Sequence, residues 1–258
     1  MISITQDKNL KIGWQVRLIF YISLHKKDKP LLHKIKEFFG VGSISQHGED
    51  AVQYKISSKK DLQFVIDHFD KFSLITQKEA DYELLKQAFI LIKNKEHITL
   101  QGLKKIIAIR AALNLGLTDQ LKAAFPNTVP VLRPSVIKPL ALDPNWVTGF
   151  TSGEGCFLIN IYKATTNTGE AVKLVFQLVQ HYRDEELMKS FIIYFNCGNT
   201  YRVGNIINYK VTTWCDITQN IIPFFKKHPI KGVKSQDFDD WCKVADMMKE
   251  RKHLTVKA

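Results

Sequence analysis

Apolar and polar side chains alternate along residues 2–24, with the period of two that is typical of a β-strand with one buried face. The apolar face contains Val16, Leu18, Phe20, Ile22 and Leu24, and the other face contains Gln15, Arg17, Ile19, Tyr21 and Ser23. Residues 2–8 have the pattern of an antiparallel partner, joined by a turn at 8–13. The chain therefore begins with a predicted β-hairpin that has one apolar and one mixed, basic face.

The hydrophobic period then changes to that of a helix over 28–40, where Leu31, Leu32, Ile35, Phe38 and Phe39 form one stripe. A second hairpin is predicted from strands at 43–47 and 51–57, followed by helices near 59–71, 76–94 and 100–115. Five of the eight prolines then fall between 126 and 144, which predicts an extended, semi-rigid linker over 126–143.

Beyond this linker the first part of the sequence repeats. The run LVFQLVQHYRDEELMKSFIIYFNCG from Leu174 matches LIFYISLHKKDKPLLHKIKEFFGVG from Leu18 almost without gaps. Near the ends of the two copies, the sequence 97–99 (HIT) is matched by 253–255 (HLT). A match of this length predicts two copies of one α/β unit, the first over 1–125 and the second over 144–258.

The net charge of +12 and the pI near 9.4 indicate a polyanionic partner, nucleic acid first and an anionic membrane second. No segment approaches 18 uninterrupted apolar residues, so no membrane-spanning helix is expected. The N-terminal residues resemble neither a signal peptide nor a presequence, so a protein that works in an organelle would be made there. Cys156, Cys197, Cys215 and Cys242 lack metal-binding spacing and are predicted to be buried, reduced thiols.

The run NWVTGFTSGEGCFLIN is predicted to be a short helix that continues directly into a strand. Asp143 can cap the helix and Pro144 suits its first position. Gly149 and Gly153 are four residues apart, so they share one face on which another helix can approach closely. Glu154 lies at the negative end of the helix, where a bound cation explains a carboxylate better than packing does. The simpler alternative is an exposed glutamate at a glycine-rich helix end.

This stretch, together with the duplication, resembles the LAGLIDADG homing endonucleases, in particular the two-repeat monomers of fungal mitochondrial introns. The resemblance implies an α/β (α+β) fold of two tandem αββαββα units with antiparallel sheets, related by a pseudo-twofold axis at the paired signature helices. It implies Mg²⁺-dependent hydrolysis of double-stranded DNA, with Glu154 and the Gly153 carbonyl as metal ligands. It also implies a monomer that is encoded in the mitochondrion.

Lys78 and Lys234 have equivalent positions in the two copies, and the resemblance implies that such a basic residue borders the active site and stabilises phosphate charge. The alternative is a solvated lysine at a helix start. His25 and His181 also recur, but both stand at strand ends before a helix and are predicted to have structural roles.

The polar faces of two four-stranded sheets are expected to read base edges in the major groove. Alternation selects Ser3, Thr5, Asn9, Lys11, Gln15, Arg17 and Tyr21 in the first sheet, with Gln53 and Lys55 on its second hairpin. In the second sheet it selects Asn160, Tyr162, Lys173, Gln177, Arg202, Asn208 and Lys210. The alternative for any one of them is an ordinary solvated position.

Extending the repeat offset back from the second signature helix places its partner about ten to three residues before Met1. We therefore interpret the sequence as a truncated reading frame, with a first unit that lacks its helix and acid and a shortened second unit. Such a chain is expected to cleave DNA poorly or not at all. Two alternatives stay open: a maturase that binds intron RNA on the same scaffold, and a degenerate product without function.

Overall fold

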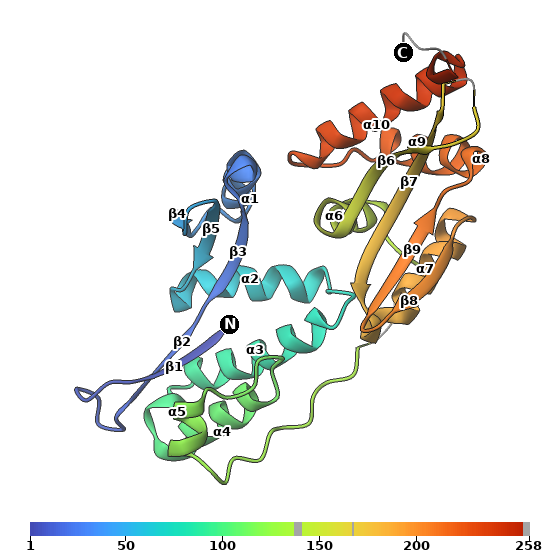
Figure 1. Cartoon of the computed structure of the whole chain (residues 1–258). Coiled ribbons are helices and arrows are strands. Elements are labelled where there is room, and N and C mark those ends of the chain that lie inside the picture. Colours follow the sequence, from blue (N-terminus) through green and yellow to red (C-terminus); the bar gives the residue numbers. More distant parts are fainter. Residues whose placement is uncertain (137–140, 167, 255–258) are drawn as a thin grey trace. The chain divides into compact units, whose positions relative to one another are not determined.

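The computed structural model describes residues 1–136, 141–166 and 168–254, and the chain divides into two compact units, Met1–Lys138 and Pro139–Ala258 (Figure 1). The division falls inside the predicted linker. Each unit has its own sheet structure and helices, so each is described separately.

Over residues 1–136, the first unit contains a hairpin, a further strand and a second hairpin, with one α-helix after the third strand and four α-helices after the fifth. Its elements are β1 Ile2–Gln6, β2 Trp14–Leu18, β3 Phe20–His25, α1 Lys29–Phe39, β4 Ser43–His47, β5 Ala51–Ile56, α2 Lys59–Lys71, α3 Lys78–Lys93, α4 Leu100–Ala111 and α5 Asp119–Ala124. The helices cover one face of the strands: the Phe20 ring contacts Phe39 of α1 and Phe69 of α2, with ring centroids 6.0 and 5.9 Å apart. Short α5 was not predicted.

The strands of the first unit do not form the single four-stranded sheet that was predicted. β1 pairs with β2, and a separate antiparallel sheet has the order β3-β5-β4. The break falls at Ile19, which was placed on the solvent face but is only 9% exposed. Because Leu18 and Ile19 are both buried, the alternation of the pleat is interrupted there.

Part of the predicted linker packs against the first unit instead of bridging freely. Val131 lies against the hydrophobic core, and its N–H donates to the Ala108 carbonyl of α4 at 3.2 Å. The segment therefore contributes to the first unit at least as far as Arg133, which donates to the Ala112 carbonyl at 3.0 Å.

The second unit has the order α6 Pro144–Glu154, β6 Gly155–Lys163, β7 Glu170–His181, α7 Glu185–Phe195, β8 Asn199–Val203, β9 Ile206–Val211, α8 Trp214–Asp216, α9 Ile222–Lys227 and α10 Lys234–Lys249. The four strands form one antiparallel sheet, β6-β7-β9-β8. Phe157 and Phe176 of the sheet pack against Phe225 of α9 and Trp241 of α10, so the helices cover one face. The other face is left for solvent or a ligand.

The two units share the same succession of strands and helices over 14–98 and 170–254, which confirms the duplication. They differ in that the single strand β7 corresponds to β2 and β3 together, and in that α2 of the first unit is one uninterrupted helix. Its counterpart is α8, a π-helical turn Ile217–Ile221 and α9, with Pro223 near the start of α9. Proline has no N–H to donate, and a wide turn accommodates the missing bond.

The prediction of four buried thiols is wrong for two of them. Cys156 lies on the open face of β6 and Cys215 on short α8, and both are exposed, whereas Cys197 is buried and Cys242 half-buried. Burial raises the pKa of the Cys197 thiol. None of the helices in the described ranges is long and apolar enough to cross a membrane.

Candidate active site and nucleic-acid interface

Helix α6 begins as the sequence predicts. Asp143 accepts the N–H groups of Asn145 (2.7 Å) and Trp146 (3.2 Å), and Pro144 is the first helical residue. The helix ends at Glu154, and the chain continues directly into β6. The Glu154 side chain is exposed, so its carboxylate is available to a ligand.

One face of α6 is anchored within the second unit. Thr148 is buried, and its hydroxyl donates to the Pro144 carbonyl at 2.9 Å and lies 3.3 Å from the His228 carbonyl. The Phe150 ring stacks on Phe191 of α7 with centroids 5.7 Å apart. These contacts fix the helix and with it the position of Glu154.

Gly149 and Gly153 leave another face of α6 open. A Cβ added to either glycine would meet no atom of the described residues within 4 Å. The space that a closely packed second helix requires is therefore present. The predicted helix interface at these glycines stays a prediction.

Lys234, the first residue of α10, lies at the C-terminal end of α6. Its ammonium donates to the carbonyls of Gly155 at 2.6 Å, Gly153 at 3.3 Å and Thr151 at 3.5 Å. Carbonyls at a helix C-terminus carry partial negative charge and lack intrahelical partners, so a cation is favourable there. The fold thus brings Lys234 to the helix end that carries Glu154, although the two are far apart in sequence.

Glu154 and the Gly153 carbonyl fit part of a hard-cation site. Mg²⁺ typically binds one or two carboxylates and completes its ligand set with water and substrate phosphates. Within the described ranges no three His, Cys, Asp or Glu residues cluster to form a protein-only metal site. The donor set is therefore one that a phosphate ligand would complete.

Lys78 is the first residue of α3, as Lys234 is of α10. Its side chain is exposed, and its backbone N–H donates to the Thr76 hydroxyl at 3.2 Å. The equivalent positions of the two lysines are confirmed, and their chemical role stays a prediction.

In the first unit, the register brings most of the predicted DNA-reading residues together in pairs. Ser3 is opposite Arg17, Thr5 opposite Gln15, and Tyr21 opposite Lys55. Gln53 donates to the Ser23 hydroxyl at 2.9 Å. Asn9 and Lys11 lie in the exposed loop of the first hairpin, beyond the paired strands.

In the second unit, Asn160 is opposite Lys173 and Gln177 is opposite Lys210. Tyr162 shares this face through its partner Ala171. The Gln177 amide donates to Asn208 Oδ1 at 2.8 Å, and Asn208 is buried. These residues form one polar face of the four-stranded sheet, on the side away from the aromatic core.

Arg202 is a correction to the predicted face. It pairs with buried Ile207, so it points to the side of the sheet that the helices cover. Its guanidinium lies 4.2 Å from the centroid of the Tyr182 ring, and its Nε donates to the Gly204 carbonyl at 2.8 Å. Side chains alternate along a strand, so the neighbouring Tyr201 is the residue of β8 on the open face.

Sequence reasoning did not select the residues of the edge strands β4 and β8 that lie on the open faces. Ser43 and Ser45 of β4 lie opposite Lys55 and Gln53. Asn199 and Tyr201 of β8 lie opposite Lys210 and Asn208. The alternation in SISQH and NTYRV was the available signal, but SISQH has no Lys or Arg, and in NTYRV the prediction selected Arg202 instead of its neighbours.

The two recurring histidines have the structural role predicted for them. His25 Nδ1 accepts the N–H of Lys27 at 3.2 Å, and His181 Nδ1 accepts the N–H of Arg183 at 3.3 Å. Each caps the single 3₁₀ turn that leads into the following helix.

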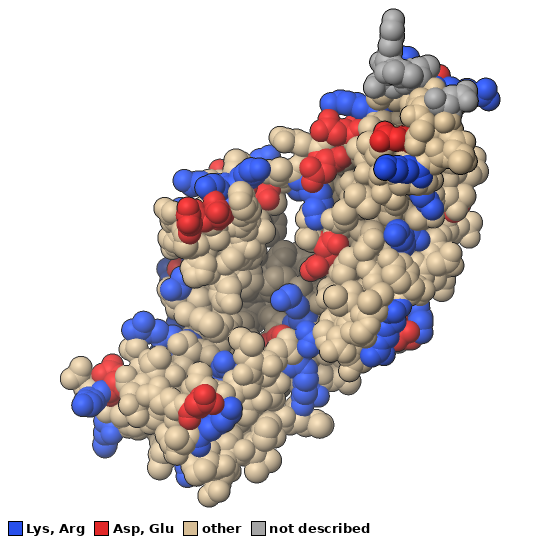
Figure 2. All heavy atoms as spheres, in the orientation of Figure 1, with Lys and Arg blue, Asp and Glu red and all other residues tan. Residues whose placement is uncertain are grey.

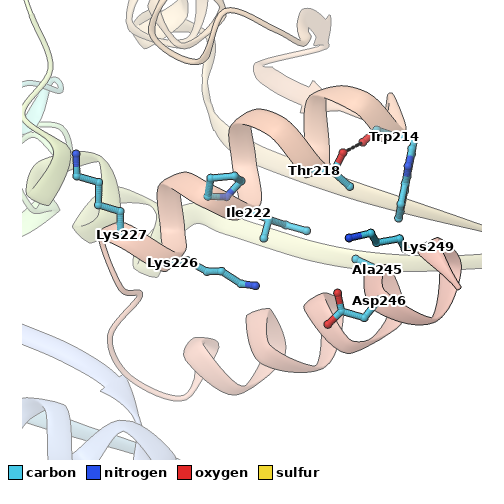
Figure 3. A pocket seen from close by; sticks show the side chains of 9 residues that line it. Trp214, Thr218, Ile222, Lys226, Lys227, Ala245, Asp246 and Lys249 are labelled. Atoms are coloured by element: carbon cyan, nitrogen blue, oxygen red, sulfur yellow. Dashed lines mark hydrogen bonds between the residues drawn. The ribbon is translucent and has the colours of Figure 1, made fainter.

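Positive charge also extends over the helical side of each unit. Figure 2 shows Lys and Arg side chains on the visible surfaces of both. A cleft of about 590 Å³ lies between α9 and α10, and Lys226 and Lys249 reach into it beside Asp246 (Figure 3). Its counterpart in the first unit, about 550 Å³, is lined by Lys59, Lys60, Lys93 and Lys95. None of the predicted site residues lines either cleft.

Comparison with known sequences shows similarity to LAGLIDADG endonucleases over both units of the chain. The profile of the LAGLIDADG endonucleases matches residues 1–89 and 147–245. Probable intron-encoded endonuclease 3 of Neurospora crassa is 40% identical over 261 residues, which cover 99% of this chain and 49% of that protein. Probable intron-encoded endonuclease 2 of the same fungus is 37% identical over 272 residues, which cover 100% of this chain and 59% of that protein. The chain thus spans about half the length of these relatives.

Solved structures are similar over a larger share of their length. I-SmaMI bound to an uncleaved DNA target with calcium ions is 41% identical, with a TM-score of 0.98, covering 100% of this chain and 89% of that one. I-CpaMI bound to uncleaved DNA is 40% identical, with a TM-score of 0.96, covering 100% of this chain and 90% of that one. The duplicated α/β units and the family profile agree with these similarities, and the chain belongs to the LAGLIDADG endonuclease family.

Proposed function

We propose that the protein is a site-specific endonuclease of intron homing that hydrolyses phosphodiester bonds in double-stranded DNA. The observation that carries this proposal is the exposed Glu154 at the fixed end of α6, next to the Lys234 ammonium. A carboxylate and an ammonium at one exposed helix end can serve a metal ion and a phosphate respectively. The solved relative I-SmaMI, for which structures with uncleaved and cleaved DNA exist, supports the same reaction.

The open sheet faces are the surfaces that we assign to DNA. Antiparallel β-ribbons fit the major groove, where Arg and Lys can bind guanine and where Asn and Gln can bind adenine. Arg17 and Lys173 hold equivalent places in the two units, as do Gln53 and Asn208. Two matching faces indicate a composite target site, with one part read by each unit.

We assign divalent metal binding, with Mg²⁺ as the physiological ion, to Glu154 and the Gly153 carbonyl. When bound, such an ion supplies Lewis-acid stabilisation and a nucleophilic water for phosphodiester hydrolysis. Glu154 would hold the ion against the scissile phosphate. Lys234, and Lys78 at the equivalent position, would stabilise negative charge that develops on the phosphate oxygens.

We infer that the gene lies in a mitochondrial intron and that one chain supplies both halves of the DNA-reading surface. Similar proteins include an uncharacterized protein of ND4 intron 1 in Podospora anserina and a cox1 intron-2 protein of Schizosaccharomyces pombe. Because both repeats belong to one chain, a monomer suffices for a two-part target.

A plasmid that carries the intron-insertion sequence tests the proposed function. We expect the full-length protein, by which we mean the protein with a signature helix and its acid in each repeat, to cut both strands in Mg²⁺ and to bind the same duplex in Ca²⁺. Glu154→Gln should abolish cutting and change the dissociation constant for DNA by less than about threefold, because the sheets supply the affinity. Binding of intron RNA in preference to every duplex, without cleavage, would instead identify a maturase.

A further inference from the structure

Arg133 clamps the start of helix α3 from the segment that follows the first repeat. Its Nη2 donates to the Gln77 carbonyl at 3.1 Å, and its Nη1 donates to the Ala112 carbonyl at 3.0 Å. The same Nη1 lies 2.8 Å from Asp81 Oδ1, and both side chains are about 28% exposed. One guanidinium thus joins the linker segment to the N-terminus of α3 and the C-terminal end of α4.

These contacts fall on the first turn of α3, where Thr76 supplies the local caps: its hydroxyl accepts the Lys78 N–H at 3.2 Å and its carbonyl accepts the Glu79 N–H at 2.8 Å. Gln77 is the N-cap residue, and its side chain makes no capping hydrogen bond. The first intrahelical bond, from the Asp81 N–H to the Gln77 carbonyl, is long at 3.4 Å. Arg133 binds both this carbonyl and the Asp81 carboxylate, so it fixes the two ends of that turn.

The charge of Arg133 suits the Ala112 carbonyl at the C-terminal end of α4, but it does not explain the contacts at the start of α3. A cation near a helix N-terminus opposes the helix dipole, so neutral capping groups or anions suit this end better. Asp81 offsets the charge, and Asn114 Nδ2 donates to Asp81 Oδ2 at 3.0 Å. The planar guanidinium instead fixes the relative positions of its acceptors, because its donors point in rigid directions.

We propose that Arg133 is a positioning residue that fixes the position of Lys78. Lys78 directly follows Gln77 and is the first residue of α3. This proposal rests on the proposed function, in which Lys78 stabilises phosphate charge. Lys234 is placed by its own hydrogen bonds to α6, whereas the exposed Lys78 side chain depends on where the first turn of α3 is held. Backbone carbonyls thus position Lys234 directly, whereas Arg133 positions Lys78 through the backbone of the first turn of α3.

A double-mutant cycle on the full-length protein tests this. We expect Arg133→Ala to lower the single-turnover cleavage rate about 10-fold, because small misplacements of a catalytic group cost one to two orders of magnitude. The affinity for DNA should stay within about twofold, since no sheet residue changes. In a Lys78→Ala background the further loss from Arg133→Ala should fall below about twofold, because the two act as one unit. In a Lys234→Ala background, Arg133→Ala should again lower the single-turnover cleavage rate about 10-fold.

Controls separate positioning from stability. Arg133→Lys keeps the charge but not the fork and should recover only part of the rate. Lys122→Ala removes one positive charge and the exposed ion pair with Asp119, and should leave the rate unchanged. Rates are compared well below each melting temperature, so that loss of folded protein does not contribute.

The possible outcomes distinguish a wrong proposed function from a wrong role of Lys78 or of Arg133. An inactive parent protein overturns the proposed function and this inference together. A Lys78→Ala protein that cleaves at the parental rate overturns the role of Lys78 and with it the role of Arg133. A Lys78→Ala protein that is impaired, with Arg133→Ala either harmless or equally damaging in both backgrounds, overturns the inference about Arg133 alone.

Discussion

At the scale of single residues, Lys234 shows how one side chain can serve both structure and chemistry. Its ammonium holds the carbonyls at the end of α6, including that of Gly153, which we assign to the metal. A hydrogen bond from a charged donor contributes about 1.5–3 kcal/mol. In the proposed function the same cation would also stabilise phosphate charge, at the helix end that carries the exposed Glu154.

We expect Lys234→Met to lose more activity than stability. The substitution keeps the apolar part of the side chain and removes the ammonium, so it should lower the free energy of unfolding by about 1–3 kcal/mol. Cleavage should fall by about 100-fold or more, since one electrostatic stabiliser of the transition state is worth that much. Urea denaturation and single-turnover cleavage measure the two effects, and a Met variant with parental cleavage would exclude a catalytic role.

A second residue-scale prediction concerns acid stability at Asp70. Hydrogen bonds from Lys86 (2.6 Å) and Tyr82 (2.5 Å) hold the pKa of the Asp70 carboxyl below its ordinary value. A carboxyl with a lowered folded-state pKa adds stability above its unfolded pKa and loses it as the pH falls through the folded value. Asp70→Asn should therefore destabilise the protein at pH 7 and reduce the loss of stability on acidification below pH 4. Urea midpoints across that range test this, and an unchanged pH dependence would contradict it.

At the scale of elements, α6 is a short helix that must hold Glu154 in place. Its cap, its anchored face and its open glycine face have separate functions: the cap begins the helix, Phe150 and Thr148 fix it, and the glycines leave room.

We expect Asp143→Ala to remove the cap of α6 and to destabilise the second unit by about 1 kcal/mol. Asp143→Ser, which keeps a capping oxygen, should cost only a few tenths of that amount. Chemical denaturation compares the two. Equal losses for both variants would show that the side-chain cap is not what stabilises α6.

At the scale of the whole molecule, the excess of 37 Lys and Arg over 25 Asp and Glu predicts strong dependence of DNA affinity on salt. We expect the logarithm of the binding constant to fall linearly with the logarithm of salt concentration, with a slope of about −5 or steeper. Replacing Gln177 by Ala should weaken binding to the target duplex and leave this slope unchanged, because a base contact releases no counterions. Fluorescence titrations at several salt concentrations measure both, and a slope near zero would contradict the DNA-binding surface.

The sequence by itself determined the repeat, the order of elements and the helix that ends at Glu154. The order of elements and the helix follow from local rules, namely the hydrophobic period of two or of about 3.6 residues and the Asp-Pro start of α6. The repeat follows from direct comparison of the runs that begin at Leu18 and Leu174. Local rules also explain the histidine caps, because His25 and His181 bind N–H groups only two residues away.

Only the tertiary structure decided which distant groups meet and which face an ambiguous side chain takes. Lys234 reaches the end of α6 from 79 residues beyond Gly155, and Arg133 reaches Gln77 across 56 residues, contacts that no sequence period encodes. Arg202 was assigned to the wrong face because alternation in a short strand does not say which of its two faces is buried, and the pairing of Arg202 with buried Ile207 decides this. Ile19 was assigned to solvent but lies at the break between β2 and β3, where it is buried. Packing against the core decides which face is buried, so the sequence pattern alone could not predict it.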